Sequence, residues 1–206
     1  SGYDGGGINT NGVMLIINST LTGNTVPNGR YGAAMAIGTG LDSVLVLNTA
    51  FYNNKNSARS SPYGSTDGIY ILNGKLVSYN TYLMAGEEND LIITRGENNI
   101  FSDTDPFTSA SSNDYTLKNN STLLGVGVSS VVFDGVTYSA PSVDIIGNTR
   151  PSPSGTKPDI GAYETLTVPD VTAPTMTITA TDGSSAVSDG ATTNDAALTV
   201  TFTSSE

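Results

Sequence analysis

The 206-residue sequence contains no cysteine, no histidine and no tryptophan. The lack of cysteine excludes disulfides, thiolate nucleophiles and cysteine-ligated zinc. The lack of histidine excludes a Ser-His-Asp triad, histidine-ligated metals and imidazole acid-base catalysis within this chain. Asp, Glu, Lys, Arg and Tyr are therefore the only side chains left as candidates for proton transfer.

Positive charge is scarce as well, with 8 Lys and Arg against 19 Asp and Glu and a formal net charge of -11. We expect no nucleic-acid partner, because nothing in the chain would neutralise phosphates in number. No apolar run approaches the roughly 18 to 20 residues that span a bilayer, so direct membrane insertion is not expected either. The chain shows no signal-like segment at its start and stops within a strand-like pattern. We therefore expect the same polypeptide to continue on both sides.

The residues that are abundant, Gly, Ser, Thr and Asn, are those of a chain built from short strands and many turns. Only 13% of the residues are charged. This composition predicts an all-β fold without long helices. The length allows one or two domains, and the change of pattern after residue 164 favours two.

A repeat runs through the first half of the chain. Residues 14–24 (MLIINSTLTGN) align with residues 44–54 (VLVLNTAFYNN) at an offset of 30, and residues 76–84 (LVSYNTYLM) form a looser copy 32 residues later. Small and apolar residues precede each copy, at 5–8, 33–37 and 68–71. We therefore expect each unit to hold two strands and a turn. A fourth, degenerate unit is expected at 90–94 and 98–101.

Two arrangements of these strands are compatible with the pattern. Asn-Gly dipeptides at 11–12, 28–29 and 73–74 are strong hairpin signals and would fit an antiparallel sheet. In a parallel solenoid, equivalent residues of neighbouring coils instead stack at about 4.8 Å, so a recurring residue has a physical role. Recurrent Asn at one corner favours the parallel β-helix, although Asn is also common throughout the chain. The predicted amide ladders are Asn18, Asn48 and Asn80, and Asn24 with Asn54.

Three motifs in residues 3 to 164 resemble a known family. They are GGGI at 5–8 leading into NST at 18–20 and GN at 23–24, then DYTL at 114–117 followed by Ser121, and finally DIIG at 144–147, Arg150-Pro151 and PDIGAYE at 158–164. These motifs are similar to those of bacterial secreted proteins with a pectate-lyase-like, right-handed parallel β-helix and a C-terminal region of the choice-of-anchor type. The sequence departs from the family pattern at Thr122 and Gly125, where the family usually has Pro and Asp.

The resemblance implies a fold and a location more than a reaction. It implies the C-terminal coils and cap of a right-handed parallel β-helix over residues 1–164, and a secreted or cell-surface location in a bacterium. The repeat itself fades after the fourth unit, which predicts a cap from Asp114 to Glu164. From their residue types alone, Asp159 and Glu164 look like a carboxylate pair with Arg150 as their partner. We favour a structural salt bridge and turn hydrogen bonds that close the end of the helix.

The residues after 164 follow a different pattern. Residues 165–175 contain Pro169 and Pro174 and have the composition of a linker. Alternating apolar and Thr residues then predict strands with one buried face at 176–181 and 198–202. This pattern resembles the start of a bacterial immunoglobulin-like β-sandwich, so residues 176–206 are expected to form a truncated domain of that kind.

Two functions remain open, and each has candidate residues. A polysaccharide lyase or glycosidase with its catalytic coils upstream would use clustered carboxylates for Ca²⁺ and a basic residue for proton abstraction. The candidates for these two roles do not recur on adjacent coils, so the favoured interpretation is that they lie in solvated loops. The Ca²⁺ candidates are Glu87, Glu88 and Asp90 beside Asn89, or Asp103 and Asp105; the catalytic candidates are Arg59, Asp67 and Arg95.

The preferred function is a non-catalytic adhesion or glycan-binding module. Polysaccharide and cell-surface glycan binding needs aromatic faces and hydrogen-bonding side chains, and both are supplied by Tyr52, Tyr63, Tyr70, Tyr79 and Tyr82. The long polar stretch at 53–67 is the expected place for binding. The ligand-binding candidates are Tyr52, Arg59, Tyr63, Asp67 and Tyr70.

Overall fold

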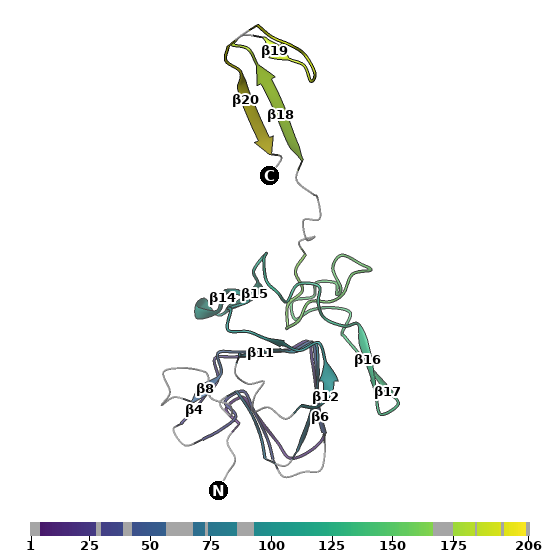
Figure 1. Cartoon of the computed structure of the whole chain (residues 1–206). Helices are drawn as coiled ribbons and strands as arrows, with labels where there is room; N and C mark the ends of the chain where they lie inside the picture. Colours follow the sequence, from purple (N-terminus) through teal and green to yellow (C-terminus); the bar gives the residue numbers. More distant parts are fainter. Residues whose placement is uncertain are drawn as a thin grey trace. The chain divides into compact units, whose positions relative to one another are not determined.

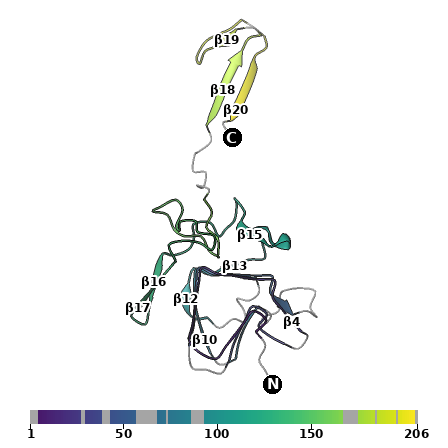
Figure 2. The same cartoon turned by 180° about the vertical axis from the view of Figure 1, so that it is seen from behind.

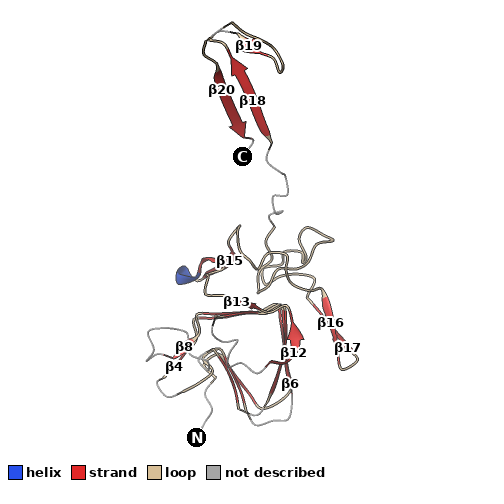
Figure 3. Ribbon diagram, in the orientation of Figure 1, coloured by secondary structure: helices blue, strands red, loops and turns tan. Residues whose placement is uncertain are grey.

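The computed structural model describes residues 5–27, 30–38, 43–56, 68–72, 74–85, 93–166, 175–183, 185–194 and 196–204. The described residues form an all-β chain with parallel sheets and a single short 3-10 turn, η2 (Ala110–Ser112), drawn in blue in Figure 3. No helix in this part of the chain is long and apolar enough to cross a membrane. The chain divides into two compact units, Ser1–Val168 and Pro169–Glu206.

Four parallel sheets make up the first part of the first unit. Sheet A has the order β1-β5-β9, sheet B β12-β10-β6-β2, sheet C β13-β11-β7-β3, and sheet D β4-β8. Their bounds are β1 Ile8–Thr10, β2 Met14–Ile17, β3 Thr20–Thr22, β4 Thr25–Val26, β5 Met35–Ile37, β6 Ser43–Leu47, β7 Ala50–Tyr52, β8 Lys55–Asn56, β9 Ile69–Ile71, β10 Lys75–Tyr79, β11 Tyr82–Leu83, β12 Ile93–Glu97 and β13 Ile100–Phe101.

Each passage of the chain contributes one strand to several of these sheets, and we number the passages as repeats 1 to 4. They cover residues 5–27, 30–56, 68–85 and 93–101, and their traces overlie one another in Figure 1 and, from behind, in Figure 2. Equivalent residues lie opposite each other: Met14 pairs with Val44, and Val44 with Leu76, in parallel register. The sequence offsets of 30 and 32 are thus the spacing of paired strands.

The strand arrangement differs in two ways from what the sequence predicts. The antiparallel alternative is wrong for the described repeats, because β1 and β2, on either side of Asn11-Gly12, lie in different sheets. The dipeptides at 28–29 and 73–74 lie outside the described residues or only partly within them. Repeats 1 and 2 hold four strands each instead of two. One extra division falls at Asn18 and Asn48, whose φ angles are 42° and 47°. The other falls at Gly23 and Asn53, whose φ angles are 66° and 51°.

The core lies between the sheets and follows the two-residue period of each strand. In sheet B, Ile16, Val46 and their neighbours point inward, and in sheet C the inward row includes Phe51 and Leu83. Burial of this apolar surface is the main favourable term for folding. The buried cluster comprises Ile16, Ala34, Met35, Ile37, Val44, Val46, Phe51, Ile69, Leu76 and Leu83.

The remainder of the first unit, which we call the C-terminal segment (residues 102–166), packs on the outside of sheet C. Its strands are β14 Phe107–Ser109, β15 Asp114–Leu117, β16 Ser130–Phe133 and β17 Val136–Ser139, paired as two antiparallel hairpins. Ala50 and Tyr82 form an outward row of sheet C and are fully buried beneath Phe107, Leu117, Leu123 and Ile160. The segment expected to cover the end of the stack therefore packs against its side, because this outward row is itself apolar.

The second unit is a three-stranded antiparallel sheet of order β19-β18-β20. Its strands are β18 Met176–Thr181, β19 Ala186–Val187 and β20 Thr199–Ser204. Ile178 and Phe202 pair across the sheet but are 60% and 65% exposed. The expected alternation is present, whereas the expected burial of its apolar face is wrong for the described residues, which supply no second layer.

Candidate functional site

An asparagine occupies the same corner of successive repeats, between the strands of sheets B and C. Asn18, Asn48 and Asn80 have φ angles of 42°, 47° and 46° and are 6%, 0% and 7% exposed. Asn is one of the few residues other than Gly that adopt this left-handed conformation at low cost. The corner therefore explains both the residue type and its recurrence.

The corner amides bond partly to each other and partly to the C-terminal segment. Asn48 Nδ2 lies 3.1 Å from Asn18 Oδ1, as a ladder requires. Asn48 also donates to the Val128 carbonyl at 2.7 Å and accepts from the Val128 N–H at 2.8 Å. Asn80 donates to the Val126 carbonyl at 2.7 Å and has no side-chain bond to Asn48 among the described contacts. The expected continuous ladder stops at Asn48, because the backbone of Val128 occupies its Oδ1.

The second predicted ladder links repeats 1 and 2. Asn24 Nδ2 donates to Asn54 Oδ1 at 2.9 Å, and the Asn24 backbone N–H donates to the same oxygen at 3.1 Å. Asn54 Nδ2 in turn donates to the Leu21 carbonyl at 2.8 Å. These amides tie the turn after sheet C to the next repeat.

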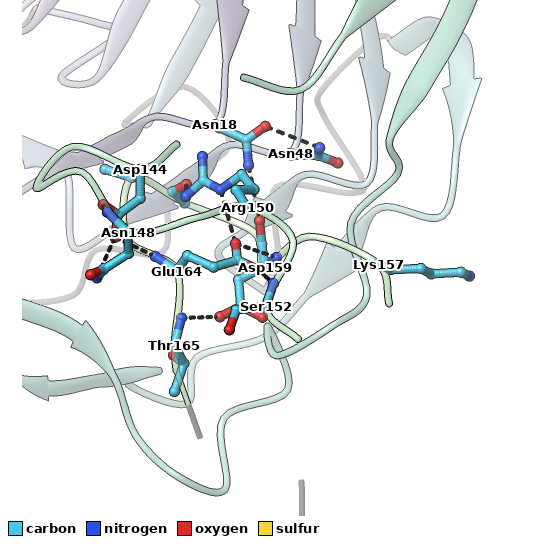
Figure 4. A network of polar contacts seen from close by, with 12 residues as sticks. Asn18, Asn48, Asp144, Asn148, Arg150, Ser152, Lys157, Asp159, Glu164 and Thr165 are labelled. Carbon is cyan, nitrogen blue, oxygen red and sulfur yellow. Dashed lines mark hydrogen bonds and ion pairs between the residues drawn. The ribbon is translucent and has the colours of Figure 1, made fainter. Parts of the chain in front are cut away.

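A buried ion pair lies next to the first corner residue (Figure 4). Arg150 Nε is 2.9 Å from Glu164 Oε2, and the two side chains are 1% and 0% exposed. Glu164 also accepts from the backbone N–H groups of Ser152 and Asp159, at 2.9 and 3.0 Å. Arg150 Nη2 donates to the Gly161 carbonyl at 3.2 Å. Such additional hydrogen bonds are what a desolvated ion pair needs to be tolerated.

Asp159 connects this network to the repeats. Its carboxylate accepts from the backbone N–H groups of Gly125 at 2.6 Å and Thr165 at 2.8 Å. Its carbonyl accepts from Asn18 Nδ2 at 3.0 Å. The carboxylate therefore fixes the path of the C-terminal segment while the backbone beside it contacts the asparagine corner.

Asp144 is the third buried carboxylate of the network. It accepts from the backbone N–H groups of Glu164, Ile146 and Asn148, at 2.9, 2.9 and 2.8 Å. Burial alone would raise its pKa, but these hydrogen bonds, with one from the Asn148 side chain, together hold the pKa of Asp144 below its usual 3.8. In all three carboxylates of the network the oxygens accept hydrogen bonds from backbone N–H groups.

The other candidate residues do not converge on this network. Tyr52 is half-buried with its ring edge-on to Phe107 at 5.8 Å, and Tyr70 stacks on Tyr31 at 4.9 Å. Arg95 is exposed, lies 3.5 Å from Asp134 and sits over the Phe133 ring. Outside the described residues lie Arg59, Tyr63, Asp67, Glu87, Glu88, Asn89 and Asp90.

The remaining two Ca²⁺ candidates have local partners. Asp103 accepts from the Ala85 backbone N–H at 3.0 Å, and Asp105 accepts from that of Phe107 at 2.9 Å. Asp105 also lies 3.7 Å from Lys118 Nζ. Within the described ranges no group of three or more acidic side chains is placed to hold a metal ion.

Sequence reasoning missed one corner residue, Asn98. Tyr79 pairs with Glu97, so the residues that follow them, Asn80 and Asn98, occupy equivalent positions. Asn98 also has a positive φ, 56°. An Asn directly after a strand in the fourth unit was the available signal, but its offset of 18 residues from Asn80 departs from the offsets of 30 and 32 between the earlier repeats.

Comparisons with protein-family models, with curated proteins and with solved structures found no match to this chain.

Proposed function

We propose that this chain is a non-catalytic module of a secreted or cell-surface bacterial protein that binds glycan or matrix. In this proposal, residues 1–164 are the C-terminal coils of a right-handed parallel β-helix, and the C-terminal segment fastens its last coils. Residues 176–206 begin an immunoglobulin-like domain, and 165–175 link the two. The parallel register of repeats 1 to 4 and the left-handed asparagine corner support the β-helix.

The hydrogen bonding of the buried ionisable groups supports the non-catalytic part of the proposal. Glu164 and Asp159 accept hydrogen bonds on both carboxylate oxygens, and Arg150 donates to Glu164 and to a backbone carbonyl. A general acid or base must exchange a proton with a substrate, so it needs an oxygen or nitrogen within reach of that substrate. These groups are instead used to hold the backbone in place.

The exposed surface supports glycan binding. Tyr31 is 43% exposed and stacks on Tyr70 of the next repeat, with 24° between the ring planes. Aromatic faces surrounded by hydroxyl and amide groups are suited to sugar rings. The net charge of -11 disfavours anionic polymers at long range and so favours neutral glycans over polyuronates.

The test is a glycan array probed with the 206-residue chain, paired with a lyase-absorbance and reducing-end assay on soluble polysaccharides, with and without Ca²⁺. Binding without turnover is the expected result. Turnover of any polysaccharide that is lost in Arg95→Ala would contradict the non-catalytic assignment. No binding to any glycan would contradict the binding assignment.

A further inference from the structure

Asn98 differs from the other three corner asparagines in its partners. Asn18, Asn48 and Asn80 each donate to a carbonyl of the C-terminal segment and are buried. Asn98 has the same left-handed backbone but is exposed, and its side chain makes no hydrogen bond with any residue in the described part of the chain. The fourth corner amide is therefore free to bond to a ligand.

The strand register brings two more functional groups to this corner. Leu47, Tyr79 and Glu97 lie directly opposite one another on neighbouring strands of sheet B. Neighbouring strands are about 4.8 Å apart, so the Tyr79 ring and the Glu97 carboxylate are adjacent on the outer face. Leu47 is fully buried, Tyr79 is half-buried and Glu97 is exposed. Tyr79 and Glu97 are therefore accessible to solvent, whereas Leu47 is not.

A cleft of about 290 Å³ lies over this row. Its near wall is formed by Tyr79, Glu97 and Asn98, and its far wall by the C-terminal segment from Gly127 to Val132 together with Lys157. Lys157 points away from the buried ion-pair network, as Figure 4 shows. Neither Glu97 nor Lys157 has an ion pair within the described ranges.

We propose that this cleft binds one pyranose unit of a neutral glycan, with Glu97, Asn98 and Lys157 bonding its hydroxyl groups beside the Tyr79 ring. The proposal rests on the glycan-binding function above and assigns that function a site. The carboxylate only accepts hydrogen bonds, the ammonium only donates them, and the amide does both, so together they match the paired donor and acceptor character of sugar hydroxyls.

Charge selects a neutral sugar. Glu97 and Lys157 both line the cleft and together give it no net charge, so a carboxylate attracted by Lys157 would also be repelled by Glu97. The acidic chain as a whole also repels polyanions. A uronate would therefore bind less well than the corresponding neutral hexose.

The experiment measures calorimetric affinity of the 206-residue chain for soluble gluco-, galacto- and manno-oligosaccharides, with oligogalacturonate as the acidic comparison. Glu97→Gln, Asn98→Gly and Lys157→Met should each weaken binding of the preferred neutral oligosaccharide by about tenfold or more, and Gly is used at position 98 because it keeps the left-handed backbone. Lys75→Met, at the opposite end of β10, and Asp189→Asn, in the second unit, are the controls and should leave affinity unchanged. Circular dichroism and the unfolding midpoint should be unchanged in all five variants, since all five side chains are exposed.

The possible failures are distinguishable. Unchanged affinity in all three cleft variants would overturn the site and leave the glycan-binding function standing. Preferential binding of oligogalacturonate, strengthened by Glu97→Gln, would overturn the neutral class. Absence of binding to every glycan would overturn both the site and the function.

Discussion

Leu15 and Leu45 lie opposite each other on neighbouring strands and point to the same outer face of sheet B, yet Leu15 is 45% exposed and Leu45 only 4%. The same contrast recurs at the corner, where Asn48 is buried and Asn98 is exposed. The repeat makes these residues equivalent in backbone position. Their contribution to stability therefore depends on whether a neighbouring strand or the C-terminal segment buries them.

Two ion pairs of the first unit show the same difference between buried and exposed positions. Arg150 and Glu164 are almost fully buried, whereas Arg95 and Asp134 are 56% and 74% exposed. Arg150→Met should lower the free energy of unfolding by about 3 to 5 kcal/mol, because it leaves the Glu164 carboxylate buried without its counter-charge. Arg95→Met should cost about 1 kcal/mol or less. Urea denaturation of the two variants checks this, and equal losses would contradict the structural role of the buried pair.

The two leucines test burial directly. Leu45→Ala should destabilise the first unit by about 2 to 5 kcal/mol, since it removes a buried side chain and leaves a cavity. Leu15→Ala should cost under about 1 kcal/mol, as for most exposed substitutions. Thermal or urea unfolding followed by far-UV circular dichroism measures both. Equal losses of unfolding free energy at the two positions would contradict the exposure of Leu15.

The corner asparagines test the contact with the C-terminal segment. Asn48→Gly keeps the left-handed backbone but leaves the N–H and carbonyl of Val128 without their partner, so it should cost about 2 kcal/mol. Asn98→Gly removes a side chain without a described partner and should change stability by less than about 0.5 kcal/mol. If the two variants were equally destabilised, the corner would act through the backbone alone.

A smaller effect should appear as a pH dependence. The pKa of Asp144 in the folded chain is below 3.8, so the unfolded chain takes up this proton first as the pH falls. Its contribution to stability is therefore fully present above pH 3.8 and is lost as the pH falls further, through the folded pKa. Asp144→Asn should cost about 1 to 2 kcal/mol at neutral pH. The difference from wild type should shrink in urea titrations below pH 3.8, and a constant difference would contradict the ionised state.

Much of the repeat architecture was predictable because each repeat carries the same short sequence pattern. The offset of 30, the two-residue alternation and Asn at one corner together predict strands, pairing partners and a left-handed turn. The number of strands in each repeat was not predictable, because positive φ angles at Asn18 and Asn48, and again at Gly23 and Asn53, divide what looks in the sequence like one continuous strand. The fourth corner residue was missed because the offset to repeat 4 is only 18 residues, from Tyr79 to Glu97, instead of 30 or 32.

The position of the C-terminal segment was beyond local reasoning. The bonds of Asn48 to Val128 and of Asn18 to Asp159 join residues separated by 80 and 141 positions. No periodicity connects such residues, and Val126 and Val128 contribute only backbone atoms, which leave no trace in residue type. The ion pair could be anticipated from the residues around PDIGAYE, but its contact with the asparagine corner could not.

Amide hydrogen exchange tests the central claim most directly, namely that the C-terminal segment is held to the repeats by the asparagine corner. The N–H groups of Gly125, Val128 and Gly161 lie outside regular strands, yet they donate to Asp159, Asn48 Oδ1 and the Asn48 carbonyl. We predict that they exchange slowly, far more slowly than the exposed sheet at 176–204, and that Val128 loses protection in Asn48→Gly. Rapid exchange of residues 125–128 in the wild-type chain would contradict the claim.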